Sequence, residues 1–296
     1  MINGGAQAIL HKREFDALAA LAYRESGLKL APEKMLMVQS RLRHRLRALT
    51  LSDFETYAEF VCSSDGFSER RYLISALTTN VSHFFRERHH FDLLQQALQP
   101  VLQDRVRSGQ RIRIWSAGCS NGQEPYSIAM HLLRAEPDLA GVDFRILATD
   151  IDPRVVAYAQ RGVYTAQQAS SLREAHIDEF TQPDQDSNCV AISEQVKACV
   201  TFRELNLLSE WPMRSQFDAI FCRNVVIYFD SSTQNRLWPR FHNALKEDGM
   251  FFLGHSERIA EPASRGFRSI GPTAYTKVSK QTYMPAGEKG DIHGTS

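Results

Sequence analysis

The sequence predicts an α/β protein, with a mostly parallel sheet covered by helices on both faces, an all-helical N-terminal domain and a small antiparallel β-subdomain insertion. From about Glu14 to Leu98, apolar residues recur at three- and four-residue steps, which is helical spacing. From Arg111 onward, short β-rich runs alternate with longer helical stretches. Such alternation is typical of βαβ units and therefore of a parallel sheet.

The same patterns predict the domain boundaries. We expect a helical domain over residues 1–95, a linker over residues 96–110, where a proline and a polar stretch interrupt the apolar rhythm, and a sheet domain over residues 111–280. Between about residues 163 and 202 the sequence turns polar between short alternating runs, which predicts the antiparallel insertion. The tail, residues 281–296, has almost no large apolar residues, so we expect it to be disordered.

Composition narrows the classes of protein that need to be considered. The net charge of +1 is too small to suggest bulk attraction to nucleic acid or to anionic lipid. No apolar run approaches the roughly 18 residues of a membrane span, and the first residues do not look like a signal peptide, so we expect a cytoplasmic protein. The five cysteines are widely spaced and never form a CxxC pair, so we expect free thiols and no metal. Nothing suggests an obligate partner, and we expect a monomer.

The segment that follows the first predicted strand is the most informative. It consists of a strand over residues 111–116, a turn bounded by Gly118 and Gly122, and a helix that opens at Pro125. A strand, a glycine turn and a helix start form the ligand-binding switch of open α/β sheets. Such turns also occur for packing reasons alone, and the segment by itself leaves both interpretations open.

Asp150, at the end of the next predicted strand, is a second candidate for ligand binding. Its carboxylate could accept two hydrogen bonds from the hydroxyls of a ribose. Alternatively, Asp150 or Asp152 caps the helix that begins at Pro153, and Asp152 fits the cap better. A GxGxxG phosphate loop is missing, and Glu124 would repel a pyrophosphate. An adenosine that carries an amino acid therefore fits better than a dinucleotide, because a carboxylate attracts its ammonium group.

Several segments, in order, resemble the CheR family of chemotaxis receptor methyltransferases over residues 15–278. They are LTTNVSHFFRERHHF, SAGCSNGQEPYSIAM, ATDIDPRVVAYAQRGVY, FRELNLL, WPMRSQFDAIFCRNVVIYFD and LGHSE. The resemblance implies a class I, Rossmann-like methyltransferase domain that binds S-adenosylmethionine. It further implies methyl transfer to glutamate side chains in the cytoplasmic helical domain of chemoreceptors, which gives methyl esters and S-adenosylhomocysteine and serves sensory adaptation.

The resemblance also implies which residues form the cofactor site. The implied cofactor-binding residues are Asn80, Ser82, Arg86, Gly118, Glu124, Asp150, Asn206, Leu207, Arg223 and Asn224. Within this set, Glu124 would hold the methionine part and Asp150 the ribose, while Asn206 and Leu207 would flank the adenine. Family members usually have Thr where Ser82 stands, and Thr and Glu where Asn121 and Gln123 stand. We expect these changes to affect cofactor affinity and not the type of reaction.

For catalysis, we expect Arg86 and Tyr228 to orient the substrate carboxylate by hydrogen bonds. A glutamate has an ordinary pKa of about 4.3, so it is already ionised at neutral pH and needs no general base. Placement and removal of water are then the main contributions of the protein. The alternative for Tyr228 is a buried tyrosine at a strand end. We take Phe84, Phe85 and Phe91 as core of the last N-terminal helices, and the GHSE segment as a turn.

A row of arginines in RLRHRLRAL is the candidate surface for docking an acidic receptor. Its members are Arg41, Arg43, Arg45 and Arg47. On a helix they spread around about half of the circumference, with the leucines facing inward. An ordinary solvated face is the alternative. The polar QPDQDSN stretch has no glycine, which puts a tether to the receptor C-terminus in doubt.

Two other functions are weighed against receptor methylation. The first is a methyltransferase of nucleic acid or of another protein, because NVVIY loosely resembles the Asn-Pro-Pro-Tyr signature of amino-group methylases. Both prolines are absent, and a flipped base would favour a more basic surface. The second is a regulator that binds S-adenosylmethionine without catalysis. The presence of Glu124, Asp150, Arg86 and Tyr228 together argues against it.

Overall fold

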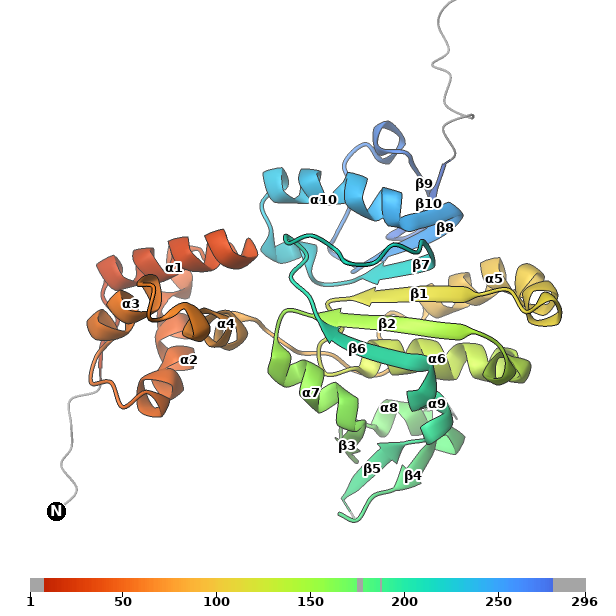
Figure 1. Cartoon of the computed structure of the whole chain (residues 1–296), viewed down its shortest axis with the longest axis horizontal. Helices are drawn as coiled ribbons and strands as arrows, with labels where there is room; N and C mark the ends of the chain where they lie inside the picture. Colours follow the sequence, from red (N-terminus) through yellow and green to blue (C-terminus); the bar gives the residue numbers. More distant parts are fainter. Residues whose placement is uncertain (1–7, 175–177, 187, 279–296) are drawn as a thin grey trace, which may run out of the picture.

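The computed structural model describes residues 8–174, 178–186 and 188–278. An N-terminal group of helices lies beside a large sheet flanked by helices, and a small second sheet projects from that domain (Figure 1). The predicted fold class is thus confirmed. The predicted tail, residues 281–296, lies outside the described residues. No helix within the described ranges is long and apolar enough to cross a lipid bilayer.

Four α-helices build the N-terminal domain around a core of its own. They are α1 (Lys12–Ser26), α2 (Met35–Ala48), α3 (Phe54–Cys62) and α4 (Phe67–Leu77), with the 3-10 turn η1 (Pro32–Lys34) before α2. Residues at helical spacing, such as Leu18, Leu42 and Leu73, are fully buried in this core. Helix α1 ends at Gly27, whose φ of 72° lies in the left-handed region that glycine adopts without steric cost.

Seven strands form the main sheet, in the order β6-β2-β1-β7-β8-β10-β9. They are β1 (Ile112–Ala117), β2 (Phe144–Asp150), β6 (Val200–Glu204), β7 (Phe217–Cys222), β8 (Leu245–Leu253), β9 (Phe267–Gly271) and β10 (Ala274–Lys277). Neighbours from β6 to β8 are parallel, whereas β10 and β9 are antiparallel at one edge. Since the strand order reverses beside β1, the carboxyl ends of β1 and β7 flank a switch point, where open α/β sheets bind ligands.

Helices cover both faces of this sheet. Helices α5 (His89–Ser108), α6 (Gln123–Ala135), α7 (Pro153–Arg161) and α9 (Glu194–Cys199) contribute to the core on one face. Helix α10 (Ser231–Ala244) packs on the other, where Trp115 and Trp238 are fully buried (Figure 1). Short 3-10 turns lie at η2 (Pro137–Gly141), η4 (Val226–Tyr228) and η5 (Pro262–Arg265).

The predicted insertion is a three-stranded antiparallel sheet in the order β3-β5-β4. Its elements are β3 (Val163–Thr165), α8 (Ser170–Glu174), η3 (Asp178–Phe180), β4 (Thr181–Pro183) and β5 (Cys189–Ile192). One part of the prediction is wrong, because residues 200–202, expected in the insertion, belong to β6, the edge strand of the main sheet. A short alternating run looks the same in either sheet.

The predicted linker over residues 96–110 is also wrong, because α5 runs through it to Ser108. Pro100 lies inside this helix with its side chain exposed, so the proline does not end the helix. The segment without helix or strand between the two domains is residues 78–88. Phe84, Phe85 and Phe91, expected in the N-terminal core, instead pack in the core of the sheet domain. Burial of these rings was predicted correctly, but not the domain that buries them.

Candidate functional site

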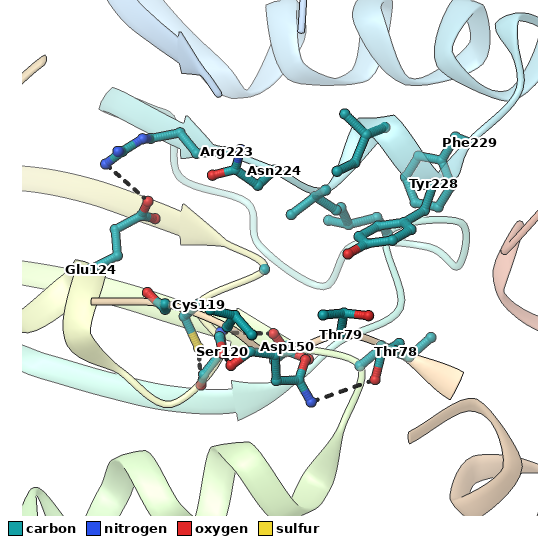
Figure 2. Close-up of a pocket in the computed structure, with 18 of the residues that line it drawn as sticks. Thr78, Thr79, Cys119, Ser120, Glu124, Asp150, Arg223, Asn224, Tyr228 and Phe229 are labelled. Carbon is teal, nitrogen blue, oxygen red and sulfur yellow. Dashed lines mark hydrogen bonds and ion pairs between the residues drawn. The ribbon is translucent and has the colours of Figure 1, made fainter. Parts of the chain in front are cut away.

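A pocket of about 440 Å³ opens at the carboxyl ends of the central strands. Its walls come from the turn after β1, the ends of β2, β6 and β7, and residues 78–83 between the domains (Figure 2). Every residue predicted to bind the cofactor lines this pocket, as does Tyr228, whereas none of the four arginines of α2 does. Chain segments far apart in the sequence therefore meet where the resemblance places a ligand.

The glycines of the turn after β1 serve close packing. Gly118 has a φ of 85°, and a Cβ there would lie 2.3 Å from Cγ2 of Val225. Gly122 has a φ of 88°, and its Cβ would lie 2.7 Å from that of Ala159. The turn is tied to β2, since the N–H groups of Gly118 and Cys119 both donate to the Thr149 carbonyl, at 2.8 and 2.9 Å. Helix α6 begins at Gln123, two residues before the predicted start.

Asp150 is buried at the end of β2 with both carboxylate oxygens held by backbone. Oδ2 accepts the Ser120 N–H at 2.8 Å, and Oδ1 accepts the Asp152 N–H at 3.0 Å. Burial raises the pKa of Asp150 to about 6 in spite of these bonds. Each oxygen keeps a lone pair, so the carboxylate can accept two more hydrogen bonds from neighbouring hydroxyls. Asp152 caps α7 by accepting the Arg154 N–H at 2.9 Å, as predicted.

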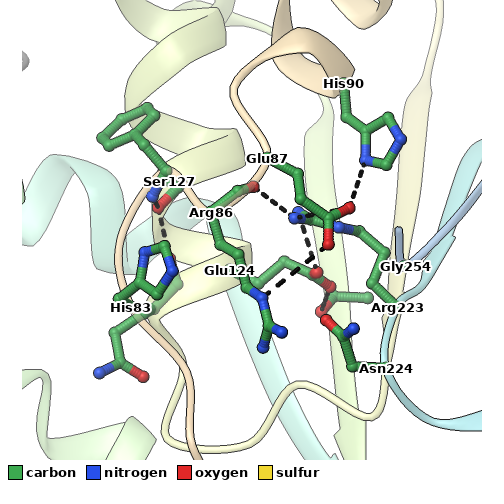
Figure 3. A network of polar contacts seen from close by, with 12 residues as sticks. His83, Arg86, Glu87, His90, Glu124, Ser127, Arg223, Asn224 and Gly254 are labelled. Carbon is green, nitrogen blue, oxygen red and sulfur yellow. Dashed lines mark hydrogen bonds and ion pairs between the residues drawn. The ribbon is translucent and has the colours of Figure 1, made fainter. Parts of the chain in front are cut away.

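Glu124 and Arg223 place opposite charges side by side in the pocket (Figures 2 and 3). Glu124 Oε2 lies 3.4 Å from Arg223 Nη1, and Oε1 accepts the Ser116 hydroxyl at 2.6 Å. Burial raises the pKa of Glu124, whereas the Arg223 guanidinium opposes that rise. The α-ammonium and α-carboxylate groups of an amino acid lie close together, so a neighbouring anion and cation can bind them. The pair therefore suits the methionine end of a nucleoside cofactor.

Glu87 is a further member of this charge network that the sequence did not reveal (Figure 3). Its carboxylate lies 3.4 Å from Arg223 Nη2 and 3.3 Å from His255 Nδ1. Arg223 Nη2 also donates to the carbonyl of Arg86, so the segment that carries Arg86 is held against the end of β7. Burial alone would raise the pKa of Glu87. The Arg223 cation and the hydrogen bonds from His255 outweigh this effect, so the pKa of Glu87 lies below its ordinary value.

The part of the pocket wall that residues 78–83 form is held in place by hydrogen bonds to the sheet domain. Asn80 Nδ2 donates to Asp152 Oδ2 at 3.1 Å, and the Asn80 carbonyl accepts the Ser120 hydroxyl at 3.0 Å. Gln123 Nε2 donates to the Ser82 carbonyl at 3.4 Å. The Asn80 amide therefore fixes the wall to Asp152. The Gln123 side chain supports the wall instead of extending into the cavity. Arg86 is 28% exposed and donates to the Val81 carbonyl at 3.3 Å.

Asn206 and Leu207 line the pocket at the end of β6. The Asn206 amide is held inside the protein, because Nδ2 donates to the Glu25 carbonyl at 2.7 Å and Oδ1 accepts the Leu208 N–H at 2.9 Å. One hydrogen of Nδ2 and one lone pair of Oδ1 remain, so the amide and the backbone here can both contact an adenine. Tyr228 lies across the pocket, half-buried, with its hydroxyl directed into the cavity (Figure 2).

Two of the four arginines predicted to dock substrate have structural partners instead. Arg45 forms a bidentate pair with the buried Glu69, at 2.6 and 2.7 Å. Arg41 donates to the carbonyls of Leu77 and Thr78, at 2.7 and 3.0 Å, where α4 ends. Helical spacing could not reveal these partners because they lie on another helix. Arg43 is half-buried and Arg47 is exposed, so docking stays a prediction for these two alone.

Comparison with known proteins agrees with this geometry. The family model for the SAM binding domain of CheR methyltransferase matches residues 80–276, and that for its all-alpha domain matches residues 13–78. The two matches meet where α4 ends, and not at the predicted linker. A probable chemotaxis protein methyltransferase of Rhizobium etli is 44% identical, covering 88% of this chain and 98% of the relative. The chemotaxis protein methyltransferase of Escherichia coli is 38% identical over 90% of this chain and 91% of the relative.

Proposed function

Because the chain belongs to the CheR family of S-adenosylmethionine-dependent methyltransferases, we propose that it methylates glutamate side chains in the cytoplasmic helical domain of chemoreceptors. The products would be glutamate methyl esters and S-adenosylhomocysteine. The observation that carries the proposal is the pocket that joins the Glu124–Arg223 pair to Asp150 at the carboxyl ends of the parallel strands.

The residues of the pocket fit the two polar ends of the cofactor. Glu124 offers an anion for its ammonium group, and Arg223 a cation for its carboxylate. Asp150 offers two oxygens for the ribose hydroxyls. Leu207 gives an apolar surface for the adenine at the end of β6, and Asn80, Ser82 and Arg86 close the pocket from the interdomain segment. Bound there, the cofactor would supply a methyl group carried by a positively charged sulfur. The neutral thioether that remains after transfer is a good leaving group.

Arg86 and Tyr228 would act on the substrate by orientation. A substrate glutamate is ionised at neutral pH, so neither side chain has to move a proton. The Arg86 guanidinium and the Tyr228 hydroxyl can each donate a hydrogen bond to a carboxylate oxygen. They come from different segments of the pocket wall, since Arg86 precedes α5 and Tyr228 ends η4. Arg86 and Tyr228 would thus orient the substrate carboxylate and leave its second oxygen free to accept the methyl group that the cofactor would supply.

Docking of the receptor is assigned to the exposed side of α2. With Arg41 and Arg45 engaged inside the protein, we infer that Arg47, together with Arg43, attracts the acidic receptor helices. We propose that the enzyme does so in the cytoplasm, as a monomer, without a metal ion and without binding nucleic acid.

Methyl transfer from labelled S-adenosylmethionine to receptor-containing membranes tests this function. Glutamate methyl esters are labile to base, whereas methylated amines are not. We expect base-labile label on the receptor from the wild-type protein and none from an Arg86→Met, Tyr228→Phe double variant. Base-stable label, or label on nucleic acid, would support the other methyltransferase. Cofactor binding without any transfer would support a non-catalytic regulator.

A further inference from the structure

The turn after β8 packs against the loop after β7, and this contact has no role in the function proposed above. The two strands are parallel neighbours, with Cys222 paired to Leu253 at their last residues. The loop after β7 carries Asn224 and Tyr228, which both line the pocket. The turn after β8 ends at Glu257, a carboxylate that is 3% exposed and does not itself line the pocket.

Glu257 binds the backbone of both segments through its carboxylate. Oε2 accepts the N–H of Gly254 at 2.6 Å and that of Asn224 at 2.8 Å, and Oε1 accepts the N–H of Ile227 at 3.1 Å. In the described part of the chain, no lysine, arginine or histidine forms an ion pair with it, so backbone N–H groups alone compensate the charge. Such charge-assisted bonds are stronger than those between neutral groups.

The backbone that Glu257 holds has a conformation that is uncommon outside glycine. Asn224 has a φ of 60°, in the left-handed region, which asparagine tolerates better than most other residues. Gly254 leaves the space that this conformation of Asn224 needs, because a Cβ there would lie 2.5 Å from Asn224 Nδ2 and 2.8 Å from the Asn224 backbone nitrogen. Ile227, whose N–H binds the carboxylate, directly precedes Tyr228. Both ends of the 224–228 loop are thus fixed by one buried side chain.

We propose that Glu257 is a positioning residue for methyl transfer: its carboxylate fixes residues 224–228 so that Asn224 and Tyr228 face the reacting atoms. The inference rests on the proposed role of Tyr228. It assigns Glu257 no contact with substrate or cofactor. Loss of the carboxylate should therefore lower kcat much more than it weakens cofactor binding, because Glu124 and Asp150, which would hold the two polar ends of the cofactor, lie on α6 and β2.

Glu257→Gln tests the proposal with little change of shape. The amide keeps one acceptor oxygen, but its NH₂ group would face backbone N–H donors. We expect kcat on receptor membranes to fall about 10- to 100-fold, with the Kd for S-adenosylhomocysteine within about threefold of wild type. Glu261→Gln, an exposed neighbour, is the matched control and should change neither value.

A double variant separates positioning from mere stability. If Glu257 acts through Tyr228, then Tyr228→Phe should lower kcat further by less than about twofold in the Glu257→Gln background, although it lowers kcat strongly in the wild type. Fully additive effects, or an unchanged kcat in folded Glu257→Gln, would overturn the proposal. Should that variant not fold, Gly254→Ala displaces Asn224 without removing an acceptor, and an unchanged kcat there would overturn it equally. A wild-type protein that transfers no methyl to receptors would instead refute the proposed function.

Discussion

Replacing Asp150 by Asn should separate two effects of this buried carboxylate, one on cofactor affinity and one on stability. A hydrogen bond to a charged group contributes about 1.5–3 kcal/mol. If Asp150 accepts two ribose hydroxyls, loss of its charge and of one acceptor should weaken binding by about 2–3 kcal/mol, or about 30- to 150-fold in Kd. Calorimetric titration with S-adenosylhomocysteine measures this change directly.

The same substitution should change how the stability of the ligand-free protein depends on pH. Burial raises the pKa of Asp150 from its ordinary 3.8 to about 6. A carboxyl with a raised pKa in the folded state contributes stability that is fully present below about pH 4 and is lost as pH rises through 6. At pH 7.5 its charge therefore costs up to about 3 kcal/mol. The neutral Asn removes that cost, but its NH₂ group faces the backbone N–H of Ser120 or of Asp152, which costs about 1–3 kcal/mol at any pH. The melting temperature of the variant relative to wild type should therefore be higher at pH 7.5 than at pH 5.

The two measurements can fail separately. An Asp150→Asn variant that binds S-adenosylhomocysteine within about threefold of wild type would refute the ribose role. A difference in melting temperature between variant and wild type that stays the same from pH 5 to pH 7.5 would refute the cost assigned to the buried charge. Asp138→Asn, an exposed carboxylate in η2, is the control and should leave both values unchanged.

Other positions give predictions of their own. Arg45→Met leaves the buried Glu69 without its partner, so thermal unfolding should show a loss of about 3–5 kcal/mol, whereas Lys12→Met in an exposed pair should cost less than about 1 kcal/mol. Arg47→Glu should raise KM for receptor membranes several-fold and leave cofactor Kd unchanged; a loss of both would indicate misfolding. Gly118→Ala forces a Cβ into a neighbouring valine at a φ of 85°, so melting temperature and cofactor affinity should fall together, and an unchanged melting curve would contradict this packing.

The sequence predicted best those features that depend on local pattern. Alternating β-rich and helical runs were enough for the parallel sheet, and the position of Asp152 before Pro153 was enough for the cap of α7. The linker prediction failed because Pro100 was taken as a break, although a proline on the exposed side of α5 leaves the buried face of that helix intact. Local pattern shows which residues are buried, but not which core buries them, as Phe91 illustrates.

Features that depend on distant partners could not be predicted in this way. Glu87 and Arg223 are far apart in the chain and meet only because the interdomain segment crosses the end of β7. Arg45 looks like a solvated cation on its own helix, and only the packing of α2 against α4 shows its pairing with Glu69. Glu257 lies in a segment that was taken as a simple turn. Nothing in its spacing indicates that it binds the loop of a neighbouring strand.

The helical domain helps to complete the pocket, in addition to carrying the proposed docking surface. The Lys29 N–H, just beyond α1, donates to the Tyr228 carbonyl at 3.0 Å, and the Glu25 carbonyl accepts from Asn206 at 2.7 Å. Tyr228 is thus held on one side by the Glu257 contacts to the preceding residues and on the other by the helical domain. A receptor bound at α2, as proposed above, would contact the same helical domain that helps to orient this tyrosine. The proposed docking and the alignment of the target glutamate would therefore be connected through α1, which packs against α2 and whose C-terminal end contacts Asn206 of the sheet domain.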